Sequence, residues 1–144
     1  MAKTKKLVSY LKNVPLFQGL DNRQLKQIAS LIVSRSYQPD EEIVTQGKSG
    51  FGMFTIKSGR AEAVLKNEDG SETVVNEFGP TDFFGEVALL DGGPRTASVI
   101  AREDTKCLYL GHVEFIALMH GDADIATEIA VAVAQRLRRA IAAV

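Results

Sequence analysis

Residues 83–99 read FFGEVALLDGGPRTASV, and this stretch holds the residues best suited to binding a ligand. Gly85 lets the backbone approach another backbone or a ligand closely. Residues 86–90 are long enough for one helical turn, whose first amides lack intrahelical partners and point outward. Because such amides attract negative charge, the stretch predicts a short helix that begins at an anion site.

The polar side chains around this turn add the other groups that a sugar phosphate needs. Arg95 supplies a planar cation with several donors, which matches phosphate oxygens bidentately. Thr96 adds a hydroxyl beside it, and residues 92–94 turn the chain back toward the helix. Glu86 only accepts hydrogen bonds, which suits a sugar hydroxyl. Together these groups predict a pocket for a sugar phosphate.

Length and composition predict one globular domain over residues 1–144. The chain has 144 residues and 15.6 kDa, with 45% apolar and 24% charged residues. Its 17 basic and 18 acidic side chains give a net charge of −1, which provides no global reason to bind DNA or an acidic membrane. No apolar run approaches the roughly 20 residues of a membrane span, and no secretory leader follows Met1, so we expect a cytoplasmic protein.

The cysteine and histidine content argues against a metal or cofactor. The single Cys107 excludes an internal disulfide and a cysteine-clustered metal site, and we expect it to be an inert residue in a strand. Two histidines, His112 and His120, are too few for a three-histidine centre, and we expect both at the surface. A metalloenzyme of the cupin type needs histidines on its strands, whereas these lie in the C-terminal helical region. We therefore expect no enzyme, no metal and no cofactor.

The middle of the chain has the pattern of short strands separated by turns. We expect strands over 34–37, 43–45, 52–57, 61–66, 73–78, 96–101 and 106–110. Residues 61–78, with Glu68-Asp69-Gly70 at their centre, predict a hairpin. Many short strands of this kind are typical of a sandwich, a barrel or a jelly roll, which can enclose a small ligand.

Helices are expected on both sides of the strands. A short N-terminal helix ends near Pro15, and Asp21 with Gln24 forms a capping box for the next helix. A short helix over 113–119 precedes a longer one, capped by Asp122 or Asp124. The long helix carries an apolar row at four-residue spacing, which either packs on the domain or forms a dimer seam: Ile125, Ile129, Val133, Leu137 and Ile141. The fold class is therefore mainly β with flanking helices: about 1–33 helical, 34–111 a β-roll and 112–144 helical.

Residues 84–97 resemble the phosphate-binding cassette of the cyclic nucleotide-binding domain family. FGEVALL (84–90), a glycine-containing turn and RTA (95–97) follow one another in the family's order. VPLF (14–17) and FTIKSG (54–59) resemble the family's N-terminal helical element and the strand before its hairpin. The resemblance implies a jelly-roll-like β-roll, with the cassette over 84–97 and with C-terminal B and C helices.

The resemblance also implies roles for individual residues in binding the cyclic phosphate. Arg95 would pair with the phosphate, helped by Thr96 and by the amides near Ala88 and Ala97. Thr96 would contact the phosphate or a guanine edge, so the residue leaves both cAMP and cGMP open, and we favour cAMP. The alternatives are a structural ion pair between Glu86 and Arg95 and an ordinary strand threonine at position 96.

The ribose and the base are assigned to other positions by the same resemblance. Glu86 would accept from the ribose 2′-hydroxyl, with the Gly85 backbone close by. Ala63, Val64 and Val75 fall where the family lines the base.

In this family the C-terminal helix closes over the base. Arg136 would lie near the ligand on that helix. The polar residues that follow in the catabolite activator protein are replaced here by Ala140 and Ile141, and the helix carries no aromatic residue that could stack on the base.

Two functions stay open at this point. The first is a sensor that binds a cyclic nucleotide and acts through movement of its C-terminal helix. Because no helix-turn-helix follows Arg139, its output would act in trans, through a protein partner or a homodimer, or would lie in a further part of the parent protein. The second is a protein-interaction domain with a degenerate pocket. The basic groups at residues 3–6 and 136–139 form either a solvated face or a docking surface.

Overall fold

The strands lie in two sheets, in a computed structural model that describes residues 2–48 and 51–142. Over these residues the strands are β1 (Val33–Tyr37), β2 (Glu42–Val44), β3 (Gly52–Ser58), β4 (Ala61–Lys66), β5 (Glu72–Phe78), β6 (Phe83–Phe84), β7 (Ser98–Ala101) and β8 (Thr105–Gly111). The helices are α1 (Ala2–Lys12), the 3-10 turn η1 (Pro15–Phe17), α2 (Asn22–Ala29), α3 (Glu86–Asp91), α4 (His112–Gly121) and α5 (Ala123–Ala142). Helices therefore precede and follow the strands in the chain, as predicted.

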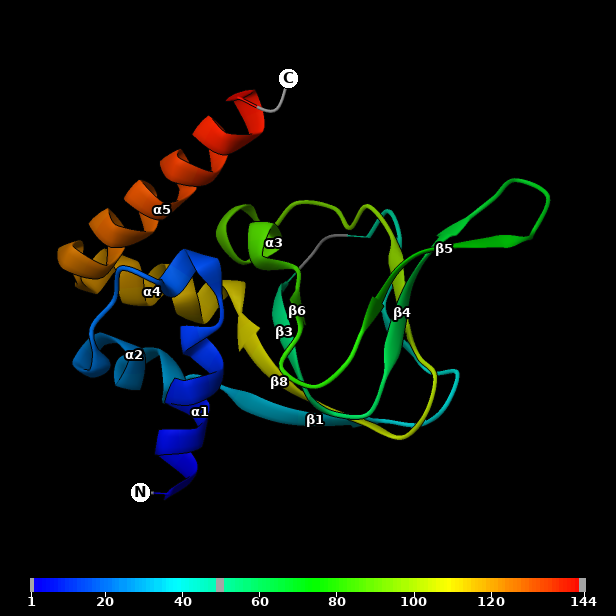
Figure 1. Cartoon of the computed structure of the whole chain (residues 1–144), viewed down its shortest axis with the longest axis horizontal. Helices are drawn as coiled ribbons and strands as arrows, with labels where there is room; N and C mark the ends of the chain where they lie inside the picture. The colour runs from blue at the N-terminus through cyan, green and yellow to red at the C-terminus, as the bar shows by residue number, and fades with distance from the viewer. Residues whose placement is uncertain (1, 49–50, 143–144) are drawn as a thin grey trace. The chain divides into compact units, whose positions relative to one another are not determined.

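Each sheet has four antiparallel strands, and among the described strands β4–β5 is the one neighbouring pair that is also consecutive in sequence. One sheet has the order β1-β8-β3-β6, whose strands are labelled in Figure 1, and the other has the order β2-β7-β4-β5. The chain passes back and forth between the sheets, so the strands form a β-roll and confirm the predicted fold class. The predicted hairpin over residues 61–78 is β4–β5, with its turn closed by a bond from Gly70 N to Asn67 O.

The core of the roll is built from the inward faces of both sheets. Its buried members come from five strands: Phe54, Ile56, Ala61, Ala63, Phe84, Val99 and Cys107. Phe54 and Phe84 are register partners on β3 and β6, and their rings stack with centroids 5.2 Å apart. Cys107 is a buried free thiol, as expected from its place in a strand. The packed aromatic pair lies where the chain enters the cassette.

The strands near the cassette differ from the prediction at one boundary and by one additional short strand. The strand expected at Thr96 starts instead at Ser98, because the Arg95 backbone is bonded to the preceding loop. Arg95 N donates to Lys48 O at 2.8 Å, and Gly47 N donates to Arg95 O at 2.9 Å. Residues 96–97 then bend toward β7. The short strand β6 was not predicted, because two residues carry no periodicity.

The described residues form two compact units, one of helices and one that contains the strands and α3. The helical unit combines residues up to Leu31 with those from Glu114, and the β unit covers Ile32–Val113. In the helical unit the predicted capping box is present: Gln24 N donates to Asp21 Oδ1 at 2.8 Å, and Asp21 N donates to Gln24 Oε1 at 2.9 Å. The predicted start of the helix at residue 22 is thereby confirmed.

The apolar row of α5 is only partly buried. Asp122 caps the helix by accepting from Asp124 N and Ile125 N at 3.1 and 3.2 Å. Ile125 and Ile129 are buried, whereas Val133, Leu137 and Ile141, further along the row, are exposed. Both alternatives for this row, packing on the β-roll and a dimer seam, stay predictions.

Candidate functional site

Position 85, at the start of the cassette helix, is one that only glycine fits well. Gly85 has φ +84° and ψ 18°, in the left-handed region, and caps α3. A Cβ at this position would overlap Nη1 of Arg95 and lie 2.8 Å from the carbonyl oxygen of Gly52. The short helix that follows, residues 86–91, has the predicted position, and its first amides face away from the helix body. Gly85 therefore brings the helix start and the arginine together.

Arg95 is held with its charge partly out of solvent. Its Nη2 donates to the carbonyl oxygen of Gly52, and its Nε is buried with no hydrogen-bond partner among residues 2–48 and 51–142. Burial lowers the pKa of Arg95, while the nearby Tyr109 and Glu86 act in the opposite direction. The guanidinium stays charged at neutral pH, because even a lowered arginine pKa lies far above it. Arg95 is therefore a positioned cation whose Nε donor has no partner among the described residues.

A cavity of about 450 Å³ opens along the cassette. Five of the predicted site residues line it: Gly85, Glu86, Ala88, Arg95 and Thr96. Ala97 is half-buried and packs instead against the hydrophobic core of the roll. The structure thus brings together the predicted groups for an anion and a sugar, with Thr96 exposed at the rim.

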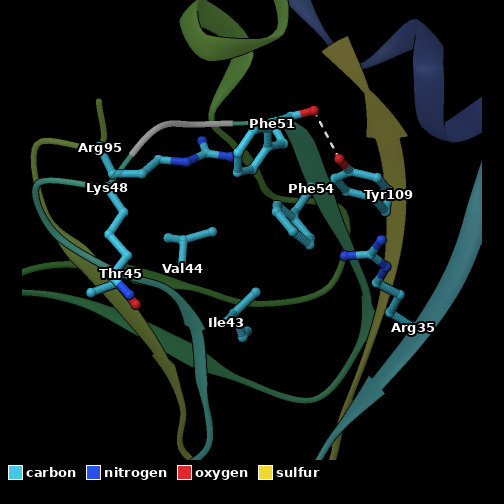
Figure 2. A pocket seen from close by; sticks show the side chains of 9 residues that line it. All are labelled: Arg35, Ile43, Val44, Thr45, Lys48, Phe51, Phe54, Arg95 and Tyr109. Carbon is cyan, nitrogen blue, oxygen red and sulfur yellow. Dashed lines mark hydrogen bonds between the residues drawn. The ribbon is translucent and has the colours of Figure 1, made fainter. Parts of the chain in front are cut away.

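A second cavity, of about 210 Å³, lies on the inner side of Arg95 (Figure 2). Ile43, Val44 and Phe54 give it an apolar lining, and Phe51 and Tyr109 add aromatic rings. Its charged lining residues are all cations: Arg35, Lys48 and Arg95. Apart from Arg95, sequence reasoning assigned none of these residues to the site, because they come from separate strands that only the fold brings together.

The residues predicted to line the base do not line either of these two cavities, and their role at the base stays a prediction. Ala63 and Val64 are buried on β4, and Ala63 belongs to the core of the roll. Val75 is 50% exposed and lies where β5 gains one residue relative to β4. The two cavities described above are lined by other residues. Arg136 lies on α5 in the helical unit, so its contact with a ligand stays a prediction.

His112 holds the far end of the cassette helix. Its Nδ1 lies 2.7 Å from the carbonyl oxygen of Leu89, and a Cβ on Gly92 would lie 3.3 Å from the imidazole ring. The ring is half-buried, so the expectation of a simple surface residue is wrong for His112. This contact joins the C-terminal end of α3 to the end of β8.

The described residues offer neither a cluster of metal ligands nor a membrane-spanning helix. In the part of the chain that the structure describes, no group of three or more His, Cys, Asp or Glu side chains could hold a metal ion. Over the same residues, no helix has both the length and the apolar character required to cross a membrane.

The fold and the cassette define a class of β-roll domain that binds a small anionic ligand, and comparison with known proteins gives the family. Residues 34–122 match the sequence model of the cyclic nucleotide-binding domain. The chain therefore belongs to the cyclic nucleotide-binding domain family, which occurs in regulatory proteins, and the predicted resemblance is confirmed.

Individual relatives support the same assignment. The chain is 37% identical over 110 residues to a cAMP-dependent protein kinase regulatory subunit of Colletotrichum orbiculare, covering 76% of this chain and 27% of that protein. It is 34% identical over 130 residues to the cyclic AMP receptor protein of Thermus thermophilus, covering 90% of this chain and 60% of that protein. The N-terminal domain of a transcriptional regulator from Streptomyces coelicolor superposes on this chain with a TM-score of 0.86 at 29% identity. The superposition covers 93% of this chain and 94% of that domain. The chain thus spans only part of the two relatives found by sequence.

Proposed function

We propose that this domain binds cAMP at the cassette and transmits binding through its C-terminal helix to a partner in trans. The observation that carries the proposal is the state of Arg95, which has a half-buried guanidinium and a buried Nε without a partner among the described residues. A phosphate oxygen supplies an acceptor for that donor, and a charged acceptor makes the bond stronger than a neutral one.

The remaining cassette groups fit the other parts of a cyclic nucleotide. Glu86 accepts from the ribose 2′-hydroxyl beside Gly85, and the first amides of α3, up to Ala88, face the phosphate. Thr96 and the amide near Ala97 complete the phosphate contacts. The relatives named for cAMP favour this nucleotide over cGMP. The exposed Thr96 hydroxyl makes cGMP the second ligand to test.

In this proposal the chain is a binding module and not a catalyst. Ligand binding shifts the C-terminal helix to the extent that the two conformations differ in affinity, with couplings of about 1–3 kcal/mol typical of such switches. The exposed apolar side chains Val133, Leu137 and Ile141 give α5 a surface through which a protein partner or a second copy receives the signal.

Titration calorimetry of the chain with cAMP and cGMP in parallel tests the proposal. Arg95→Ala should weaken cAMP binding by about 1.5–3 kcal/mol, because it deletes hydrogen bonds to a charged group. Arg60→Ala is the matched control, since Arg60 lies in the same unit and pairs with Glu62 and Glu77 instead. An absence of heat with either nucleotide would favour a nucleotide-independent interaction domain, and unchanged affinity in Arg95→Ala would place the phosphate elsewhere.

A further inference from the structure

His112 is a half-buried histidine that contacts the cassette helix from outside the cassette. Its Nδ1 lies 2.7 Å from the carbonyl oxygen of Leu89, near the end of α3. A carbonyl oxygen only accepts hydrogen bonds, so Nδ1 must carry a proton and donate to it. The side chain lines neither of the two cavities described above, so it can serve a ligand only through the elements that it holds.

The helix α3 needs such a contact because it is too short to be stable by itself. It has six residues, and isolated helices shorter than about 12 residues are marginal in water. At its C-terminal end, Gly92 N donates to the carbonyl oxygen of Ala88 at 2.9 Å, and the imidazole donates to the next carbonyl, that of Leu89. Leu89 is buried, and a buried acceptor that loses its donor is unfavourable. The imidazole therefore holds the helix in place at this end.

The main chain of His112 is joined to the backbone that supports Arg95. His112 N donates to the carbonyl oxygen of Phe51 at 2.6 Å. The Tyr109 hydroxyl donates to the same oxygen at 2.8 Å (Figure 2). The next carbonyl along the chain, that of Gly52, accepts from Nη2 of Arg95. His112 thus links α3, through its side chain, with the segment that holds the arginine.

The opposite end of α3 meets the arginine directly. Gly85 caps the start of the helix so close to Arg95 that a Cβ at this glycine would overlap Nη1. The helix is therefore fixed to the arginine at its start by Gly85 and at its end through His112 and residues 51–52. Glu86 on this helix and Arg95 line the same cavity, so both contacts decide how far apart these two side chains lie.

We infer that His112 is a positioning residue of the ligand site, whose imidazole fixes α3 so that Glu86 and Arg95 are held at the spacing that one ligand requires. The inference rests on the proposed function, since it adds a residue that supports the same site. Without the bond, part of the protein would have α3 displaced, and the apparent affinity falls with the fraction of protein whose site is assembled. The imidazole thus contributes to affinity without touching the nucleotide.

Two variants of equal shape separate the hydrogen bond from packing. Asparagine and leucine have side chains of the same size and branching, but only asparagine offers an N–H donor at the place of Nδ1. His112→Leu should weaken cAMP binding by about 5- to 150-fold, the range for a buried hydrogen-bonding group left without its partner, while His112→Asn should stay within about threefold. His120→Leu is the control, because this second histidine is exposed at the end of α4, and its affinity should change by less than about twofold. Calorimetry is run at a temperature at which thermal unfolding shows every variant to be folded.

The proton on Nδ1 gives a second measurement that does not depend on binding. The chain has two histidines, so long-range proton–nitrogen NMR spectra of wild type and of His120→Leu assign the His112 ring. At alkaline pH, where imidazole is neutral, the proton should reside on Nδ1 rather than on Nε2. If wild-type protein binds cAMP, a proton on Nε2 alone, equal affinity losses in the leucine and asparagine variants, or unchanged affinity in His112→Leu would each overturn the inference while the proposed function stands. If wild-type protein binds neither cAMP nor cGMP, both are wrong.

Discussion

Replacing Gly85 with alanine should damage the site in two separable ways. The residue has φ +84°, and placing a Cβ in the left-handed region costs about 1–2 kcal/mol. The same Cβ would also overlap Nη1 of Arg95, so the guanidinium must leave its position against the Gly52 carbonyl. The first effect acts on stability, and the second acts on the ligand site.

Gly70→Ala provides the matched control for the backbone effect alone. Gly70 has φ +87° in the β4–β5 turn, and a Cβ there would meet no atom within 4 Å. Both variants should therefore lose about 1–2 kcal/mol of unfolding free energy, which corresponds to a fall in Tm of about 2–8 °C for a chain of this size. Only Gly85→Ala should also lose ligand affinity.

The expected binding loss follows from what Arg95 contributes. Displacing the guanidinium removes hydrogen bonds to a charged group, so cAMP affinity should fall about 10- to 150-fold in Gly85→Ala and change less than twofold in Gly70→Ala. Calorimetry with cAMP and thermal unfolding of both variants give the four values needed. Equal binding losses in the two glycine variants, or no loss in Gly85→Ala, would refute the argument that Gly85 positions Arg95.

Two further predictions concern ionisable groups away from the cassette. The Arg102 guanidinium, 2.7 Å from Glu62, holds the pKa of that carboxyl below its ordinary value, so Arg102→Gln should be less stable than wild type at pH 7. A lowered pKa stabilises the fold only while the carboxyl is ionised. The difference in unfolding free energy between wild type and Arg102→Gln should therefore shrink as the pH falls through the native pKa of Glu62. Denaturant unfolding of both proteins at pH 7 and at pH 3 measures this difference. Burial raises the pKa of the Cys107 thiol to about 12, so a thiol reagent at pH 8 should label it only after unfolding; labelling of native protein at the rate of an exposed thiol would contradict its burial.

Local chemistry explains which elements could be predicted from sequence. The capping box at Asp21 involves side chains three residues apart, so the pattern alone locates the start of α2. Strand and turn signals likewise predict β4 and β5, because turn residues such as Gly70 lie between two runs of alternating character. The apolar row of α5 has the same spacing throughout, so spacing could not show that Ile125 and Ile129 are buried while the later members of the row are exposed.

The cassette could be predicted from the sequence, whereas the inner cavity could not. The cassette residues between Gly85 and Ala97 are neighbours in sequence, so the motif identifies them together. The inner cavity combines Arg35 of β1 with Tyr109 of β8, which are 74 positions apart by their residue numbers and meet only because β1 pairs with β8. Phe51 shows no motif of its own, and its exposure beside Arg95 is a property of the fold.

Two unfavourable features of the β unit lie together at the cassette. Gly85 has a left-handed backbone, which restricts the position to glycine, and the Arg95 Nε is buried without a partner among the described residues. The buried donor reduces the stability of the free protein, and natural sequences tolerate such departures mainly where function requires them. A ligand with a phosphate group would offset this cost by accepting from Nε. The two features therefore argue for an anionic ligand at the cassette rather than for unrelated defects.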